Sequence, residues 1–139
     1  MTEPFHSLDR RIQKWIFKQG WTGLRQIQND AIPPILAGNQ DVIISASTAA
    51  GKTEAFFLPA CSSTIDEKDG YSILYISPLK ALINDQYRRL ESLSIITDIN
   101  VTPWHGDVAQ SLKTKSKRNP SGIVLITPES LESLLIRNS

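Results

Sequence analysis

Residues 46–53 carry side chains of the right types, in the right order, to hold the phosphate chain of a nucleotide. The segment ends in Gly-Lys-Thr, follows an apolar run at residues 41–45 that is typical of a buried strand, and precedes helix-forming residues. In such a strand–loop–helix arrangement, backbone N–H groups at the helix start surround the β-phosphate, the lysine reaches the β- and γ-phosphates, and the threonine hydroxyl binds Mg²⁺. The alternative is a chance Gly-Lys-Thr at an ordinary helix start, and Ala46 does stand where the pattern has its first glycine. We predict that a nucleoside triphosphate contacts Ser47, Thr48, Ala49, Ala50, Gly51, Lys52, Thr53 and Glu54, with Mg²⁺ on Thr53.

Polar segments follow three further apolar runs, and these runs predict strands at residues 72–77, 99–103 and 122–127. Because the predicted strands alternate with helical segments, the chain predicts an α/β fold with a parallel sheet and helices on both faces. Ligands bind such sheets at the carboxyl ends of the strands. The segments expected there are Ser77-Pro-Leu-Lys80, Trp104-His-Gly-Asp107 and Thr127-Pro-Glu-Ser130.

Each of these three segments also has a purely structural interpretation. Lys80 at a helix start would suit a backbone phosphate, but Pro78 can simply begin a helix. Gly106 permits a positive φ and close approach to a ligand, whereas His105 is more often structural than a general base. Thr127 is an expected N-cap whose hydroxyl could instead meet a phosphate.

Composition limits the remaining possibilities. The chain has 139 residues, about one domain, and a net charge of +1, so a nucleic-acid partner would need a local basic patch. The four cations among residues 113–118 are either a solvated loop or such a patch. Cys61 is the single cysteine, which excludes an intramolecular disulfide framework. With no apolar run of about 18 residues and no signal-peptide pattern, we expect an intracellular, cytoplasmic protein without membrane association.

Two helices are expected before the phosphate-binding segment. Apolar spacing predicts one helix over residues 5–18 and a second over residues 25–37, which Pro33 and Pro34 should interrupt or kink. Gln28 lies at the start of the second helix, and a carboxamide can both donate to and accept from the edge of an adenine. The alternative for Gln28 is an ordinary solvated glutamine.

Together, these segments resemble the first RecA-like domain of a superfamily-two DEAD/DExH-box helicase, most of all the large-helicase-related (Lhr-like) branch. The motifs are carried by Gln28 with Phe5 and Gly20-Trp21 upstream (Q motif), residues 46–54 (motif I), residues 78–82 with Asp85-Gln86 (motif Ia), residues 105–107 (Gly-Asp segment) and residues 127–131 (motif Ib). The family commonly lacks the first glycine of motif I. The resemblance implies an incomplete RecA-like P-loop NTPase fold, the N-terminal part of a single domain, with a helical Q-motif region at 1–38 and an alternating β/α part at 39–139.

The resemblance also implies ligands and contacts. ATP and Mg²⁺ are the expected cofactors, and the expected partner is single-stranded or partly duplex DNA or RNA. Gln28 would read the adenine edge, with Phe5 and Arg25 beside the base. The nucleic-acid contacts that it carries over are Pro78, Leu79, Lys80, Gly106, Asp107, Thr127 and Pro128.

The catalytic motif of the family is not where the resemblance would place it. The Asp-Glu-x-His/Asp tetrad of motif II should follow motif Ib by a few tens of residues, and we expect no such tetrad in this sequence. The second RecA-like domain, an expected partner, is also missing, so we predict no catalytic residue here. We interpret the chain as an N-terminal fragment of an ATP-dependent DNA or RNA helicase that binds ATP but does not hydrolyse it alone.

Two other classes of protein remain as alternatives. The first is a stand-alone nucleotide-gated module that binds nucleic acid or regulates, without ATPase activity. A P-loop kinase or GTPase is the second, although Gln28 favours adenine. Because the predicted strand at 41–45 would lack a neighbour, we also expect the 139 residues to self-associate or to be marginally stable.

Overall fold

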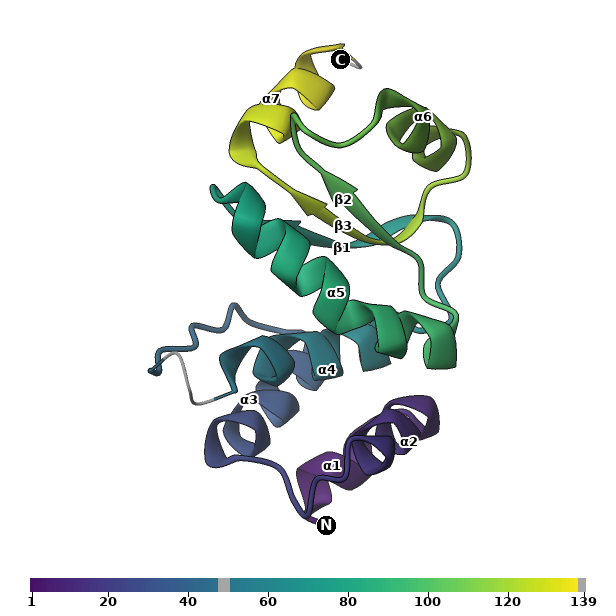
Figure 1. Cartoon of the computed structure of the whole chain (residues 1–139). Coiled ribbons are helices and arrows are strands. Elements are labelled where there is room, and N and C mark those ends of the chain that lie inside the picture. Colours follow the sequence, from purple (N-terminus) through teal and green to yellow (C-terminus); the bar gives the residue numbers. More distant parts are fainter. Residues whose placement is uncertain (48–50, 138–139) are drawn as a thin grey trace. The chain divides into compact units, whose positions relative to one another are not determined.

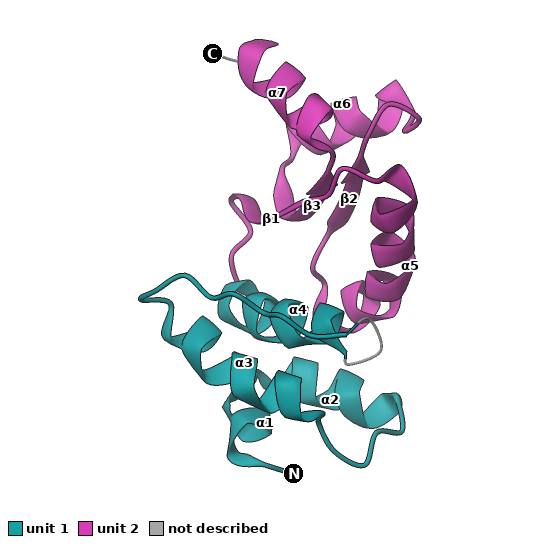
Figure 2. Ribbon diagram, turned by 90° about the vertical axis from the view of Figure 1, so that its left-hand side faces the viewer, with its two compact units in different colours: residues 1–65 teal, residues 66–139 magenta. Residues whose placement is uncertain are grey.

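The structure, a computed structural model, describes residues 1–47 and 51–137, which fall into two units, residues 1–65 and residues 66–139 (Figure 2). Unit 1 is helical, and its elements are α1 (Glu3–Ser7), α2 (Arg10–Lys18), α3 (Gln26–Ala37) and α4 (Lys52–Thr64). Unit 2 contains β1 (Gly70–Ile76), α5 (Lys80–Thr97), β2 (Val101–Trp104), α6 (Gln110–Arg118), β3 (Ser121–Ile126) and α7 (Pro128–Arg137) (Figure 1). The predicted division at residue 38 stays a prediction.

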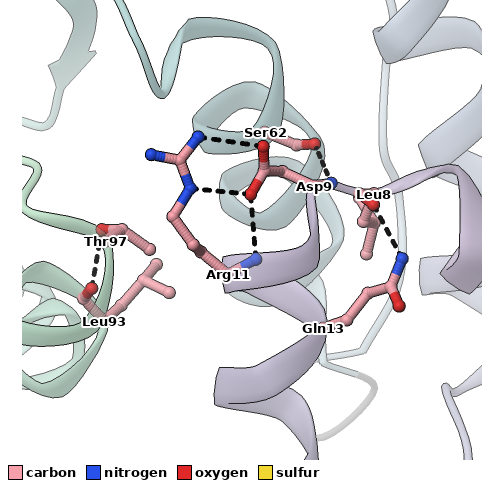
Figure 3. A network of polar contacts seen from close by, with 7 residues as sticks. All are labelled: Leu8, Asp9, Arg11, Gln13, Ser62, Leu93 and Thr97. Carbon is pink, nitrogen blue, oxygen red and sulfur yellow. Dashed lines mark hydrogen bonds and ion pairs between the residues drawn. The ribbon is translucent and has the colours of Figure 1, made fainter.

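The helix predicted over residues 5–18 is in fact two helices, separated at Asp9. The Asp9 carboxylate accepts a hydrogen bond from the Arg11 backbone N–H at 2.9 Å, which caps α2 (Figure 3). The same carboxylate pairs with the Arg11 guanidinium, and the Asp9 backbone N–H donates to Ser62 Oγ of α4 at 2.7 Å. An aspartate is a strong N-cap because its oxygen satisfies a donor that the helix cannot. The apolar periodicity of residues 5–18 therefore did not reveal that a second helix begins after Asp9.

Helices α3 and α4 pack against each other and form the centre of unit 1. Pro33 and Pro34 do not interrupt α3, which was one of the two outcomes predicted there, and the helix ends at Gly38 in the left-handed conformation. The helices bury a common set of apolar side chains. These include Phe5, Leu8, Ile12, Trp15, Ile16, Ala31, Ile32, Ala55, Leu58 and Cys61.

The strand predicted at residues 41–45 is not formed. These residues have no regular structure, and the Ile43 side chain is 94% exposed. A strand needs a backbone neighbour, and the three strands in the described ranges pair only with one another. Residues 41–45 are apolar enough for a strand, but the described residues include no neighbouring strand that pairs with them.

Unit 2 contains a three-stranded parallel sheet in the order β1-β3-β2, as the alternating pattern predicted. The register runs from Gly70 opposite Ser121 to Ile76 opposite Ile126, with an irregularity after Tyr71. Gly122 has φ +74°, and a Cβ there would collide with the Asn100 carbonyl oxygen. Only glycine permits β2 and β3 to approach so closely at their start.

Helices cover both faces of this sheet (Figure 1). On one face, Leu131 and Leu134 of α7 pack against Trp104, Val124 and Ile126. Helix α6 lies on that same face, and α5 covers the other. Two details differ from the predictions. Helix α5 begins at Lys80 and not at Pro78, and residues 110–118 form a helix and not a loop. Among the described residues, no helix has both the length and the apolar character needed to cross a bilayer.

Candidate functional site

The phosphate-binding segment leads into the start of α4. Gly51 is the N-cap, with φ +81°, and Lys52 is the first helical residue. Thr53 and Glu54 therefore lie in the first turn, where backbone N–H groups lack helical partners and attract anions. Ser47 is described and exposed, whereas the predicted contacts Thr48, Ala49 and Ala50 lie outside the described residues.

Gln28 connects the start of α3 to the start of α4. Its side chain is 2% exposed, and its Oε1 accepts a hydrogen bond from the Arg25 backbone N–H at 2.9 Å. Its Nε2 donates to the Gly51 carbonyl at 3.4 Å, a long and therefore weak bond. A Cβ on Gly51 would lie 2.6 Å from Gln28 Nε2 and 3.1 Å from Arg25 Cδ, so the glycine is required by both its conformation and its neighbours. Gln28 is thus not the solvated glutamine of the alternative interpretation.

The two residues predicted to flank an adenine differ in accessibility. Arg25 is exposed at the N-cap of α3, close to Gly51. Phe5 is fully buried, with edge-on contacts to the rings of His6 and Phe17. Phe5 therefore supports the packing of the helices in this arrangement and presents no face to a base. Its place beside an adenine stays a prediction.

The carboxyl ends of the three strands of unit 2 meet at a groove of about 620 Å³ between α6 and α7. The β1–α5 connection contributes Pro78 and Lys80, and the end of β2 contributes Trp104 and Gly106. The remaining lining residues are Gln110, Lys113 and Lys117 of α6, with Thr127, Glu129, Ser130, Ser133, Leu134 and Arg137 at or in α7. Three segments that are far apart in sequence are thus brought to one edge of the sheet, as predicted.

Lys80 lies against the Gly106–Asp107 turn. Its ammonium group is 3.4 Å from an Asp107 carboxylate oxygen, and both side chains are largely exposed. A Cβ on Gly106 would lie 3.4 Å from Lys80 Nζ. The positive φ considered for Gly106 is not adopted, so the small size of the residue, and not its conformational freedom, leaves room for the lysine.

His105 is a buried structural residue beside this turn. Its Nε2 lies 3.0 Å from Asn84 Oδ1, and its Nδ1 accepts a hydrogen bond from the Asp107 backbone N–H at 3.2 Å. With an acceptor facing Nε2 and a donor facing Nδ1, the contacts fit the neutral ring that carries its proton on Nε2. Burial lowers the pKa of His105, the Asp107 charge opposes that shift, and the Lys80 and Lys113 charges reinforce it. His105 therefore links α5 to the turn, and burial favours its neutral form by lowering its pKa.

The remaining predicted contacts lie at the starts of α5 and α7. Thr127 is buried, its Oγ1 lies 3.4 Å from the Ser130 backbone N–H, and Pro128 is the first residue of α7. Thr127 is thus the N-cap of α7, as expected if its hydroxyl has a purely structural role. Pro78 is exposed and lines the groove, whereas Leu79 is the exposed N-cap of α5 and is not among the lining residues.

Sequence reasoning missed several groups that the fold brings to the groove. These groups are Lys113, Lys117 and Arg137. The basic run at residues 113–118 did not indicate which of its cations would face the groove, and Arg137 was not predicted at all. The signal that could have found the lysines is their four-residue spacing on a helix. Conversely, an Asp-Glu-x-Asp string does occur, at residues 66–69, but it forms an exposed turn before β1. That turn lies at the amino end of the strand, away from the groove, so these carboxylates do not supply the missing tetrad.

Comparison with known proteins agrees with this geometry. The profile of the DEAD/DEAH box helicase family matches residues 25–139. The ATP-dependent helicase Lhr-Core of Saccharolobus solfataricus is 34% identical over 142 residues, which cover 92% of this chain and 16% of that protein. The chain spans 16% to 24% of the length of curated relatives such as Lhr-Core and the RNA helicase DBP9 of Candida albicans.

Solved structures show the same fold. The RNA helicase Prp28 from Chaetomium thermophilum bound to ADP has a TM-score of 0.84 and 27% identity, and the match covers 99% of this chain and 34% of that one. The DEAD-box helicase Mss116 bound to ssRNA and UDP-BeF has a TM-score of 0.80 and 25% identity, covering 92% and 27% respectively. The RecA-like fold expected from the sequence is thereby confirmed, and the chain belongs to the DEAD/DEAH box helicase family.

Proposed function

We propose that this chain binds ATP with Mg²⁺ at the start of α4 in unit 1 and a single strand of nucleic acid in the groove of unit 2. In a protein as long as its relatives, these two events would be coupled to strand separation or translocation. The observation that carries the proposal is the groove, where the ends of all three strands meet and four cations face one carboxylate. The net charge of the chain is only +1, but several of its cations gather in this groove, as binding to a polyanion requires.

The residues at the start of α4 fit a nucleotide and its metal. Gly51 makes room for the Gln28 side chain, because a Cβ there would lie 2.6 Å from Gln28 Nε2, and Lys52 and Thr53 follow it in the first turn. The Thr53 hydroxyl is a hard oxygen ligand, and Mg²⁺ is usually held by one or two protein oxygens together with phosphates and water. Across the described residues there is no cluster of three or more His, Cys, Asp or Glu side chains that could hold a metal. A single threonine with substrate phosphates is the arrangement that this donor set supports.

Gln28 is proposed to select adenine by exchanging hydrogen bonds. Its carboxamide lies within 3.4 Å of the Gly51 carbonyl, at the entrance to the phosphate-binding segment. The weak Gln28–Gly51 bond is the one that a purine edge could replace, while the shorter bond to Arg25 holds the side chain in place. Exposed Arg25 is proposed to lie beside the base.

Nucleic-acid binding is proposed to depend on the backbone and not on the base sequence. Lys80 supplies a cation, and Gly106 allows close approach. Such groups contact phosphates, which carry no sequence information. We therefore expect weak, salt-dependent binding of DNA or RNA with little base preference.

Two measurements on the 139-residue chain test the proposal. A fluorescent ATP analogue titrated with Mg²⁺ should bind weakly, with GTP competing less well than ATP. Labelled single strands of several sequences should bind with an affinity that falls as salt increases. Steady-state hydrolysis should stay at background, because phosphoryl transfer requires positioning groups and an arginine finger that we do not find here.

The opposing results are equally specific. Strong preference for one base sequence, or an affinity that does not change with salt, would contradict the nucleic-acid assignment. ATP hydrolysis above background that disappears in Lys52→Ala would contradict the absence of turnover.

A further inference from the structure

Helix α6 is strongly basic, and only some of its cationic side chains face the groove. It carries Lys113, Lys115, Lys117 and Arg118, yet only Lys113 and Lys117 line the groove. The two lining lysines are four residues apart, so they lie on the same side of the helix. The other two cations are exposed outside the lining.

The rotation of α6 about its axis is fixed by hydrogen bonds to the sheet. Ser116 Oγ lies 2.6 Å from the Tyr71 hydroxyl and 3.2 Å from Thr102 Oγ1. These bonds join the last turn of α6 to β1 and β2, so the helix cannot turn to present Lys115 or Arg118 in place of the lining pair. The selection of two lysines from four cations is a property of the fold.

Neither of the two lining lysines forms an ion pair with a carboxylate of the described residues. In the part of the chain that the structure describes, no carboxylate oxygen lies within ion-pair distance of Lys113 or Lys117, whereas Lys80 is paired with Asp107. The facing wall of the groove carries the hydroxyls of Ser130 and Ser133, and among the described lining residues Glu129 alone contributes a carboxylate. The α6 side of the groove therefore presents unneutralised cations to any polyanion that enters it.

We propose that Lys113 and Lys117 form a second phosphate-binding wall, which holds the sugar–phosphate backbone of a single strand beyond the contacts made by Lys80 and Gly106. The two lysines are about 6 Å apart along the helix axis, which suits two separate phosphates better than one. Nothing in this arrangement reads a base, so DNA and RNA share the chemistry that it recognises. This inference rests on the proposed binding of nucleic acid in the groove and specifies which face of α6 takes part.

A matched pair of variants tests it in the full chain. Lys113→Gln/Lys117→Gln removes the groove-facing charges, and Lys115→Gln/Arg118→Gln removes the same net charge from the same helix but outside the groove. Fluorescence anisotropy with labelled single-stranded DNA and RNA should be recorded over a series of salt concentrations. The groove-facing double variant should lose about fivefold in affinity per lysine at about 0.1 M salt, and its slope of log affinity against log salt should fall by about 0.7 per lysine. The outward-facing variant should keep the slope of the unaltered chain.

The outcomes separate this inference from the function on which it rests. Equal losses in both double variants would overturn it, because the effect would then be one of overall charge. Unchanged binding in the groove-facing variant, with weakened binding in Lys80→Gln, would also overturn it while the proposed function stands. Failure of the unaltered chain to bind any strand would overturn both. Thermal melting of each variant confirms that it folds, since glutamine is helix-compatible and Ser116 keeps its contacts.

Discussion

The Gln28 carboxamide of unit 1 is buried and hydrogen bonded at both ends, whereas the ammonium groups of Lys113 and Lys117 in unit 2 line a groove without a carboxylate partner among the described residues. A ligand that approaches Gln28 must replace existing bonds to the chain's own backbone. A polyanion that enters the groove meets charges that are already in place. We therefore expect the proposed nucleotide site to select by the geometry of exchanged hydrogen bonds and the proposed nucleic-acid site to attract by charge.

This difference predicts different responses to salt. Exposed charges are screened within about 10 Å at 0.1 M ionic strength, so binding in the groove should weaken steeply as salt increases. Hydrogen bonds to a buried carboxamide are much less screened. Variants that damage one site should therefore leave the other intact, and the predictions below test that independence from the largest expected effect to the smallest.

Lys52→Ala should have the largest effect. It removes the cation expected on the β- and γ-phosphates, and a charge-assisted hydrogen bond contributes about 1.5–3 kcal/mol. We expect at least about a tenfold loss in affinity for Mg²⁺-ATP. Strand binding without nucleotide should not change. Lys14→Ala, an exposed lysine of α2, is the control for charge in the same unit. A parallel loss of strand binding in Lys52→Ala would break the independence of the two sites.

Ile43→Lys tests whether the unpaired segment of unit 1 causes association between chains. Ile43 is 94% exposed, and burying an isoleucine contributes about 1.5–3 kcal/mol. We expect the unaltered chain to self-associate on concentration and Ile43→Lys to weaken that association by about tenfold or more. Ile95→Lys is the matched control, because Ile95 is 78% exposed but lies on the formed helix α5. Sedimentation at several concentrations measures both, and a concentrated chain that remains monomeric would contradict the expectation.

Asp9→Ala should destabilise unit 1 by about 1–2 kcal/mol, since it removes the N-cap of α2. The hydrogen bond from Arg11 lowers the pKa of Asp9 below its ordinary value of 3.8, although partial burial opposes the shift. The stabilisation is therefore complete above that ordinary value and is lost as the pH falls through the folded pKa. Thermal melting near neutral pH and in acid should show a deficit that shrinks in acid. Exposed Glu132→Ala should leave the melting temperature almost unchanged.

Asp107→Asn sharpens the electrostatic account of the groove. Asp107 pairs with Lys80 at 3.4 Å and repels phosphate. Removing its charge should raise affinity for a single strand about two- to fivefold, within the range of one exposed charge pair. Anisotropy titration at low salt measures the change. A weaker affinity would instead mean that Asp107 contacts the nucleic acid directly, as the resemblance to the family implied.

His105→Gln should have the smallest effect on the pH dependence of folding stability, which it should change only in mild acid. The loss of the bonds with Asn84 and Asp107 lowers stability equally at every pH. Burial lowers the pKa of His105 in the folded chain, so the unfolded chain takes up a proton first as the pH falls below about 6.5. Folding stability should be independent of this group above that pH and should decline below it. His105→Gln should remove that decline, and His6→Gln, at an exposed position of α1, should retain it. Melting curves between neutral pH and mild acid provide the measurement.

Much of the fold could be predicted because its signals are local. Continuous apolar runs marked all three strands of unit 2, and Gly38 marked the end of α3. The errors arose where a tertiary partner decides the outcome. Residues 41–45 are apolar enough for a strand but have no neighbour in the described structure, and Asp9 starts a new helix with help from Ser62, 53 residues away.

The sequence by itself determined the placement of Gly51, Lys52 and Thr53, since the three residues are consecutive and one helix start positions them all. Only the tertiary structure decided which cations share a groove. Lys80, Lys113 and Arg137 come from three different helices, and the parallel order β1-β3-β2 brings their surroundings to one edge. The choice of Lys113 and Lys117 over Lys115 and Arg118 depends on the bonds of Ser116 to Tyr71 and Thr102. Residues that are neighbours in the sequence can be identified from the sequence itself. Residues from different strands and helices become neighbours only when the strands pair.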